Sequence, residues 1–349
     1  MKKRVKLITG GLFILGAILG IGLFWVIHNK RLDSNTPNKP SLQSQNQSQP
    51  SLIQEKKAIC PLDGTLVPDK WANNRPLAVM IENSVPARPQ AGLAEAQLIY
   101  EALTEGGITR FMAIYACQEP TKVGPVRSAR IYFLDWLSEF DALFAHVGGN
   151  YDALLQIKKQ GILDLDQFRY ASAYWRELQP NKAKEHTMYT SIPKLKQLAE
   201  KNHWQTKGDY PLYQFKDDLP PNERKGSQVI TINFSGPAFL VRWKYQASTN
   251  SYLREQTNGP KIEAKNIILQ WVERWPTTSP IGEKGYQMKT IGEGKAQVFL
   301  DGQSIEGRWK KDSRKSRTRF YNSQGQEIQF NRGQTWIEIV HPGISVSVS

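Results

Sequence analysis

Arg127 and Arg130 lie three residues apart with Ser128 between them, and this spacing is suited to binding an anion. Apolar residues follow at helical spacing and predict a helix over 127–140 that starts at the two arginines. A helix N-terminus carries partial positive charge, so two arginines there need partners. Those partners are either internal carboxylates or a phosphate-type anion, held by both guanidinium groups, the Ser128 hydroxyl and the helix N–H groups.

Further polar residues follow predicted strands in the same region. Strands are predicted for 77–81, 110–117 and 142–147, and helices for 91–103, 127–140, 150–160 and 191–202. This alternation predicts an α/β domain, a sheet with flanking helices, over 60–222. In such sheets ligands bind at the carboxyl ends of strands. The further candidate ligand-binding residues are Glu82, Asn83, Glu101, Glu105, Arg110, His146, Gly148, Gly149 and His186.

Several of these candidates have a simpler explanation. His146 lies among apolar residues, where a histidine is more often a hydrogen-bonded core residue than a ligand. Glu101 and Glu105 are four apart and could act as general acid and base, yet two solvated carboxylates on a helix face fit the same spacing. The spacing of His146 and His186 does not support a metal site, so we predict none. The sequence identifies neither a catalytic residue nor a cofactor.

The N-terminal segment predicts where the protein is located. Residues 7–27 carry no charge and are long enough to cross a bilayer as a helix. The basic stub 1–6 precedes them, which predicts a cytoplasmic N-terminus and extracytoplasmic C-terminal domains. No small-residue cleavage pattern follows, so we expect an uncleaved, single-pass signal anchor in the cell membrane. Residues 28–59, rich in Ser, Gln, Asn and Pro, predict a disordered linker.

The net charge of +14 is spread unevenly over the 349 residues. Residues 1–59 carry +7 and residues 223–349 carry +8, whereas 60–222 carry −1. Outside the cytoplasm, this distribution argues against nucleic acid as a partner and favours anionic lipid headgroups or acidic wall polymers. Cys60 and Cys117 could form a disulfide there or remain buried thiols.

The C-terminal residues, 223–349, predict an all-β domain. Strand patterns cover 228–234, 239–245, 265–271, 296–300 and 335–340. A basic run lies between them and contains Arg308, Lys310, Lys311, Arg314, Lys315, Arg317 and Arg319. We predict either a solvated loop or a basic surface that binds anionic polymers or lipid headgroups.

Motifs in both halves resemble the YerB-like family. They are 60–64, 75–84, 87–90, 99–102, 105–111, 124–130 and 146–149, followed by 307–310, 317–321 and 330–336. The resemblance covers residue 60 to the end. It implies a bacterial, membrane-tethered, often lipoprotein-like protein of unknown function with an N-terminal and a C-terminal part. This chain has no cysteine near its apolar segment to take a lipid, which departs from the lipoproteins of the family.

The function that we expect is that of a membrane-anchored cell-envelope protein. It would bind an anionic wall polymer or a lipid-linked ligand carrying phosphate or pyrophosphate, through the residues around Arg127 and Arg130. One alternative is an envelope enzyme, such as a phosphotransferase on a polyprenyl-linked substrate, with Glu82, Glu101 and Glu105 as candidate metal-binding carboxylates. Another is a regulator that docks on a wall hydrolase or synthase.

Overall fold

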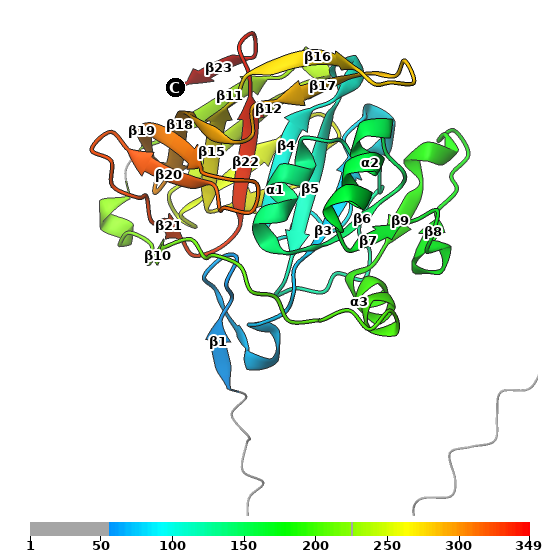
Figure 1. The fold of residues 1–349 in the computed structure, drawn as a ribbon. Coiled ribbons are helices and arrows are strands. Elements are labelled where there is room, and N and C mark those ends of the chain that lie inside the picture. Colours follow the sequence, from blue (N-terminus) through cyan, green and yellow to red (C-terminus); the bar gives the residue numbers. More distant parts are fainter. Residues whose placement is uncertain (1–55, 225) are drawn as a thin grey trace, which may run out of the picture. The chain divides into compact units, whose positions relative to one another are not determined.

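A mixed sheet of ten strands forms the centre of the folded part (Figure 1). The computed structural model describes residues 56–224 and 226–349. In spatial order the strands are β20 (Arg319–Asn322), β19 (Gln303–Lys311), β18 (Gly292–Leu300), β15 (Asn266–Trp271), β22 (Thr335–Val340), β4 (Leu98–Leu103), β5 (Thr109–Tyr115), β3 (Leu77–Glu82), β6 (Leu143–His146) and β7 (Asp164–Asp166). Five strands of each half of the chain thus form one sheet. The halves join at the parallel pair β22–β4, where Glu338 lies opposite Glu101.

A second sheet and one helix cover one face of the central sheet. The sheet has the order β14 (Ile262–Ala264), β13 (Ser251–Glu255), β12 (Leu240–Gln246), β11 (Val229–Asn233) and β23 (Ser345–Val348). Its Trp243 packs against Trp336 with ring centroids 5.1 Å apart, and Trp336 packs against Phe111 at 5.6 Å. The helix α3 (Ile192–Lys201) adds Ile192, Leu195 and Ala199 to the same core.

Two helices cover the opposite face (Figure 1). They are α1 (Phe133–Leu137) and α2 (Tyr151–Gln160), and Trp136 of α1 stacks on Tyr100 of β4 with centroids 5.3 Å apart. Neighbouring residues of β3 alternate between the two faces: Met80 packs on this side and Val79 on the other. The central strands are therefore covered on both faces.

Four short two-stranded sheets complete the described fold. They are β1 (Lys57–Ile59) with β2 (Leu66–Pro68), β8 (Tyr174–Arg176) with β9 (Met188–Thr190), β10 (Phe215–Lys216) with β21 (Phe330–Asn331), and β16 (Arg274–Thr278) with β17 (Lys284–Met288). A disulfide joins Cys60, next to β1, to Cys117, just after β5. The sequence left open whether these two cysteines are free thiols or a disulfide, and in the structure they form the disulfide.

The predicted fold class is wrong. The described chain is mostly β, and its central sheet runs through both halves, instead of an α/β domain followed by an independent β domain. The error lies in segment 91–103, predicted as a helix, which contains β4 with all six residues buried. A strand covered on both faces has no polar residue at every second position, so periodicity does not distinguish it from a buried helix.

The individual elements had mixed outcomes. The strands predicted at 77–81, 110–117 and 142–147 are confirmed as β3, β5 and β6. The predicted helices 150–160 and 191–202 are confirmed as α2 and α3, and Ser191 Oγ caps α3 by accepting a hydrogen bond from Lys194 N. The helix predicted over 127–140 is much shorter, because α1 begins only at Phe133.

The predicted stub 1–6, the predicted membrane span 7–27 and most of the predicted linker lie outside the described residues. The last part of that linker, 57–59, forms strand β1 and is not disordered. Within residues 56–224 and 226–349, none of the helices combines the length and the apolar character that a membrane crossing requires.

Candidate functional site

The loop that carries Arg127 and Arg130 is extended and lies alongside β3 and β6. Arg127 N donates a hydrogen bond to Met80 O at 2.9 Å, and Val147 N donates to Arg127 O at 3.1 Å. The expectation that these arginines stand at a helix N-terminus is therefore wrong. Neither a helix dipole nor free helix N–H groups contribute to this site, and any anion binding must come from side chains.

Three arginine side chains meet at this loop: Arg110, from the start of β5, joins Arg127 and Arg130. We call these three residues the arginine cluster. Arg110 Nη1 donates to the backbone oxygen of Ser128 at 2.7 Å, which links β5 to the loop. Arg130 Nε lies 2.7 and 3.0 Å from the two carboxylate oxygens of Glu105, so this arginine has a close internal partner.

Arg127 has a much looser partner. Its Nε lies 3.5 Å from Glu82 Oε1, which is long for a hydrogen bond. The Glu82 carboxylate is engaged elsewhere: both oxygens lie 3.0 Å from His186 Nδ1, and Ser84 Oγ donates to Oε1 at 2.8 Å. Glu82 and His186, more than a hundred residues apart in sequence, are thus brought to the cluster together.

The arginine cluster has unused donors and positive charge. Arg110 is only 6% exposed, and within the described chain its Nε has no hydrogen-bond partner. Burial, followed by the positive charge of Arg130, lowers the pKa of Arg110 to about 9. The Arg127 side chain is 30% exposed, and within residues 56–224 and 226–349 neither of its Nη groups has a hydrogen-bond partner. This arrangement suits a phosphate-type anion.

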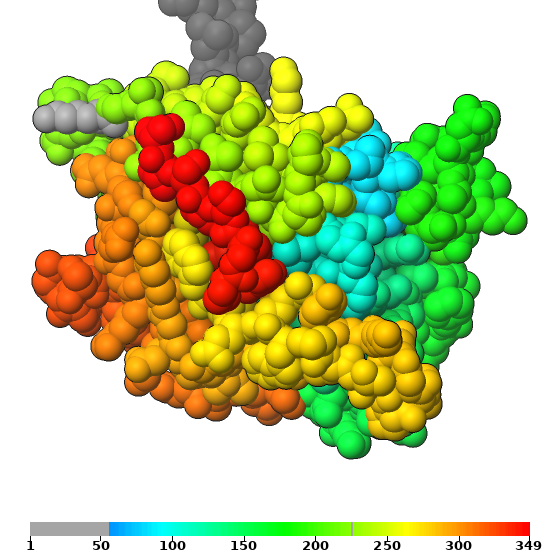
Figure 2. Space-filling model, turned by 90° about the horizontal axis from the view of Figure 1, so that it is seen from above, coloured from blue at the N-terminus to red at the C-terminus, as the bar shows by residue number. Residues whose placement is uncertain are grey.

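A hairpin from the C-terminal half borders the site. This hairpin, β16–β17, runs beside the first half of the chain when the molecule is seen from above (Figure 2). Glu283 Oε2 accepts a hydrogen bond from Tyr151 N at 2.7 Å, and Arg274 Nη2 donates to Thr104 O at 3.1 Å, directly before Glu105. Both halves of the chain therefore shape the surroundings of the cluster.

Asn83 and Glu101 point into the protein. Asn83 Nδ2 donates to Glu101 Oε1 at 3.2 Å and to Thr109 Oγ1 at 2.6 Å, and its Oδ1 accepts from Arg88 Nε at 3.0 Å. Glu101 is fully buried on β4, whereas Glu105 lies in a short turn after that strand. Glu101 is therefore not solvated, although Glu105 is partly exposed, and the two do not share a helix face, which corrects that prediction.

Glu101 belongs to a second, buried cluster. Its Oε2 accepts from Arg254 Nη2 at 2.7 Å, and Glu338 lies opposite it on β22. We call Glu101, Arg254 and Glu338 the sealed cluster, because all three are at most 3% exposed. Burial, followed by the negative charge of Glu101, raises the pKa of Glu338 well above that of an ordinary glutamate. Trp243 Nε1 donates to Glu338 Oε1 at 2.7 Å.

Aromatic rings complete the surroundings of Arg254. Its guanidinium carbon lies 4.9 Å from the centroid of Trp336, 5.4 Å from Phe111 and 5.8 Å from Trp243, distances at which a cation is attracted to a ring face. Neither Arg254 nor Glu338 was predicted from the sequence. The available signal was one acid inside the otherwise apolar run 335–340, which predicts a buried charge that needs a partner.

His146 is a buried residue with both ring nitrogens in contact with oxygen atoms. Nδ1 lies 2.8 Å from Gly148 O, and Nε2 lies 2.7 Å from Asp164 Oδ1. Gly148 has a φ of +58°, in the left-handed region that favours glycine, and Gly149 packs closely on Leu154. These contacts match the explanation of His146 as a hydrogen-bonded core residue, and they hold the turn next to the arginine loop.

The predicted basic surface is divided by the fold. Lys311 and Arg317 are buried and are not surface residues, which corrects the prediction for these two. Lys311 Nζ lies 3.0 Å from Glu139 Oε1, and the Arg317 guanidinium lies 4.0 Å from the ring centroids of both Phe140 and Tyr213. Successive residues of a strand point to opposite faces, so on β19 Lys310 is exposed and the adjacent Lys311 is buried, and composition does not reveal this.

The remaining basic residues of the run lie at or near the surface. Four of them have acidic partners: Arg308 with Glu293 (3.9 Å), Lys310 with Asp312 (3.0 Å), Arg314 with Asp135 (2.6 Å) and Arg319 with Glu327 (2.7 Å). Lys315 is exposed and, in the described part of the chain, has neither an ion pair nor a hydrogen bond through its side chain.

Comparison with known proteins gives consistent matches over the folded part. Residues 62–205 match the family model described as "Protein of unknown function (DUF3048) N-terminal domain", and residues 230–337 match its C-terminal domain. A Bacillus subtilis (strain 168) protein named "Putative lipoprotein YerB" is 31% identical over 309 residues, 84% of this chain and 89% of the relative. The crystal structure of YerB protein from Bacillus subtilis matches with a TM-score of 0.72 at 29% identity, over 83% of this chain and all of that one. The resemblance inferred from the motifs is therefore confirmed, and the chain belongs to the YerB-like family with DUF3048 N-terminal and C-terminal domains.

Proposed function

We propose that this protein is anchored in the cell membrane, with its folded part outside the cytoplasm, and binds an anionic cell-envelope ligand at the arginine cluster. The ligand carries a phosphate or pyrophosphate group and is either part of a wall polymer or linked to a lipid. The family is described as one of unknown function, and this proposal names the class of ligand that this member binds.

Three observations support the location. The uncharged segment 7–27 and the basic residues before it match the pattern of a signal anchor. The relative from Bacillus subtilis carries the word "lipoprotein" in its name, which is consistent with attachment to a membrane by another chemical route. The disulfide Cys60–Cys117 fits an oxidising compartment.

One observation carries the binding proposal: three arginines converge where the nearest carboxylates are only partly available. Glu105 is a close partner for Arg130, but Glu82 is bound to His186 and leaves Arg127 at 3.5 Å. Arg110 adds a third cation whose buried Nε has no partner in the part of the chain that the structure describes. An oxyanion between these side chains would supply the missing acceptors and lower the repulsion among the three cations.

The contacts of the candidate glutamates favour binding over the enzyme alternative. Glu101 pairs with Arg254, Glu105 with Arg130, and Glu82 with His186, so each carboxylate already has a different cationic or hydrogen-bonding partner. Metal-assisted phosphoryl transfer uses carboxylates that share one ion. The described residues include no grouping of three His, Cys, Asp or Glu side chains suited to a metal.

Thermal unfolding of the full-length chain in a nonionic detergent tests the binding proposal. Pyrophosphate at about 100 times its dissociation constant should stabilise the native state by about 2.7 kcal/mol. Sodium chloride at the same ionic strength should stabilise the native state less, because it screens charges without occupying a specific site. The variant Arg127→Gln should abolish the pyrophosphate-specific shift.

The matched control is Arg308→Gln. Arg308 is an exposed arginine outside the arginine cluster, and its acidic partner Glu293 lies 3.9 Å away. This variant should retain the shift. An equal pyrophosphate response in Arg127→Gln and the parent chain, or no response in the parent chain, would overturn the proposal. If the double variant Arg127→Gln/Arg130→Gln does not fold, the single variant still decides the question.

A further inference from the structure

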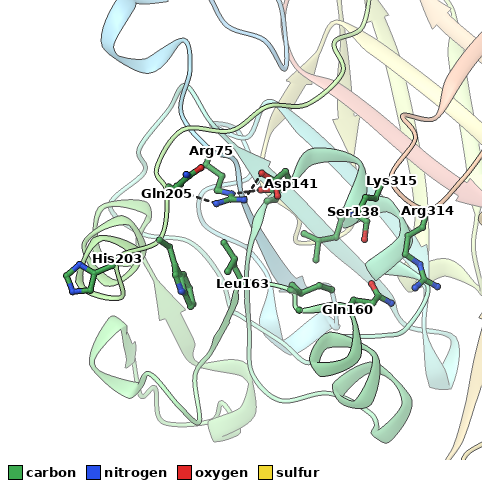
Figure 3. A pocket seen from close by; sticks show the side chains of 14 residues that line it. Arg75, Ser138, Asp141, Gln160, Leu163, His203, Gln205, Arg314 and Lys315 are labelled. Atoms are coloured by element: carbon green, nitrogen blue, oxygen red, sulfur yellow. Dashed lines mark hydrogen bonds and ion pairs between the residues drawn. The ribbon is translucent and has the colours of Figure 1, made fainter.

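A cleft at the opposite end of the central sheet from the arginine cluster has a volume of about 680 Å³ (Figure 3). Its lining comes from five segments: the chain before β3, the end of α1 with the residues that lead into β6, the end of α2 with the loop before β7, the residues after α3, and the loop after β19. This volume lies within the range of sites for small organic ligands, roughly 300–1,000 Å³.

The charge of the cleft is positive. Arg75, Arg314 and Lys315 line it together with one acid, Asp141, which gives a net charge of +2 with histidine neutral. Arg75 donates from Nη2 to Asp141 Oδ2 at 2.5 Å and from Nε to the backbone oxygen of Asp141 at 2.7 Å, so this pair is fixed within the wall (Figure 3). The excess of positive charge therefore comes from the loop that carries Arg314 and Lys315.

Those two residues are accessible to a ligand. The Arg314 side chain is 43% exposed although Asp135 accepts a hydrogen bond from its Nε at 2.6 Å. Lys315 is exposed and has no side-chain partner in the described chain. Both are part of the basic run, so the fold directs two members of that run into a concave site and buries two others in the core.

The rest of the lining is mixed, with four polar residues (Ser138, Gln160, His203 and Gln205) and a group of apolar side chains. Leu137, Ile162, Leu163 and Trp204 contribute side chains to the wall. Trp204 packs edge-to-face on Tyr170 with ring centroids 6.4 Å apart, which fixes the position of the indole. A cleft with cations at one side and aliphatic and aromatic groups at the other fits a ligand that has an anionic group attached to a hydrocarbon chain.

The position of the cleft indicates the source of such a ligand. Arg75 and Asp141 precede β3 and β6, and Cys117 follows the antiparallel β5, so the cleft and the Cys60–Cys117 disulfide lie at the same end of the sheet. Strand β1, where the described chain begins, is at this end too (Figure 1). The 55 preceding residues, which include the uncharged segment 7–27, are therefore attached at the end that carries the cleft.

We propose that this cleft binds an anionic phospholipid, with the phosphate at Arg314 and Lys315 and the first acyl carbons against Trp204 and Leu163. The membrane as the source of the lipid rests on the proposed anchoring, whereas the site itself does not depend on the arginine cluster. Bound lipid would hold the cleft end of the folded part against the bilayer and leave the arginine cluster, at the other end, facing away from it.

Short-chain lipids below their micelle concentration test this site on the full-length chain in a neutral detergent. Dihexanoyl phosphatidylglycerol should bind, as measured by titration calorimetry, while dihexanoyl phosphatidylcholine and glycerol 3-phosphate should bind at least about tenfold more weakly because one lacks net charge and the other lacks acyl chains. The variant Arg314→Gln/Lys315→Gln should weaken phosphatidylglycerol binding about 30-fold, at about fivefold per cation. Lys315→Gln alone, which removes no internal contact, should weaken it about fivefold.

Two controls separate this proposal from the proposed function. Lys261→Gln/Lys284→Gln removes two exposed cations outside the cleft and should leave lipid affinity unchanged. All lipid and glycerol 3-phosphate titrations are also made in the Arg127→Gln background, so that phosphate binding at the arginine cluster does not contribute. Unchanged affinity in both cleft variants, equal binding of the zwitterionic lipid, or equal binding of glycerol 3-phosphate would overturn the lipid site. Release of the full-length chain from membranes by alkaline carbonate would instead contradict the anchor, and would leave the lipid titration unaffected.

Discussion

The sealed cluster and the arginine cluster contain the same two residue types, and their surroundings give them opposite properties. In the sealed cluster one arginine faces two carboxylates inside a wall of aromatic rings. In the arginine cluster three arginines face the carboxylates of Glu82 and Glu105 in a partly exposed site, and Glu82 is bound to a histidine. The first has an excess of acidic side chains buried from solvent, and the second has an excess of positive charge in a site that solvent partly reaches.

Burial and pairing separate a charge that stabilises the fold from a charge that can bind a ligand. A buried ion pair that loses one member leaves an uncompensated charge in a low dielectric, so the sealed cluster must remain complete for the two halves to stay joined at β22–β4. An exposed arginine with unused donors contributes little to stability and is available for a ligand. The two clusters should therefore respond to mutation in opposite ways.

The largest expected effect is the loss of Arg254. The variant Arg254→Met retains much of the side-chain volume but leaves the buried Glu101 carboxylate without its cation. We expect the free energy of unfolding to fall by about 3–5 kcal/mol, the usual cost of breaking a buried pair from one side. Chemical denaturation of the parent chain and the variant measures this difference. A loss below about 1 kcal/mol would show that the cluster does not hold the halves together.

A smaller effect, with a characteristic pH dependence, is expected for Glu338→Gln. The raised pKa of Glu338 means that the native state binds this proton more tightly than the unfolded chain does, where a glutamate titrates near pH 4.3. This contribution to stability is fully present below about pH 4.3 and is lost as the pH rises towards the native pKa. The glutamine variant lacks this loss, so its free energy of unfolding should increase relative to the parent chain between pH 5 and pH 8.

Denaturation at those two pH values measures the expected change. Its direction distinguishes this interpretation from a simple loss of contacts, because a lost hydrogen bond with Trp243 would lower stability by a similar amount at both pH values. A difference between variant and parent chain that stays the same from pH 5 to pH 8 would show that Glu338 is ionised in the native protein, because its carboxylate would then carry the same charge in the native and the unfolded chain over this range.

The sequence was sufficient to predict local elements and insufficient to predict how they assemble. Strand β5 and helix α3 have clear patterns, with a continuous apolar run in one and a serine cap followed by Pro193 in the other. Strand β4 has no alternation because two layers cover it, and it was mistaken for a helix. The pairing of β4 with β22 joins residues more than two hundred positions apart, and no local pattern encodes such a pairing.

The same limit applies to the candidate site. Arg127, Arg130, Glu82, Glu105, Arg110 and His186 were all singled out by residue type, most of them next to a predicted strand, and the structure brings them together. Composition did not show that Glu101 faces Arg254, because Arg254 is an ordinary member of an alternating strand in the sequence. Whether Glu101 or Glu105 is buried depends on which of them the second sheet covers, and that sheet brings Arg254 to Glu101.

Arg127→Gln should have little effect on stability. Its contact with Glu82 is long and its side chain is partly exposed, so the free energy of unfolding should change by less than about 1 kcal/mol. The same chemical denaturation that is applied to Arg254→Met provides the comparison. A loss above about 2 kcal/mol would identify Arg127 as a structural residue and would remove the basis for treating the two clusters as different.

The smallest effect is expected for Glu105→Gln and concerns the affinity for pyrophosphate. It tests whether the carboxylates of the arginine cluster oppose or support anion binding. Glu105 neutralises Arg130 and competes with any anion for it, so its replacement should strengthen pyrophosphate binding by up to about fivefold, the equivalent of about 1 kcal/mol. Calorimetric titration measures the affinity, and Glu293→Gln, which removes an exposed acid paired with Arg308, should leave it unchanged. Weaker binding in Glu105→Gln would mean that this carboxylate positions Arg130 for the ligand. The arginine cluster would then resemble the sealed cluster in depending on its acids, and its excess of positive charge would not by itself explain binding.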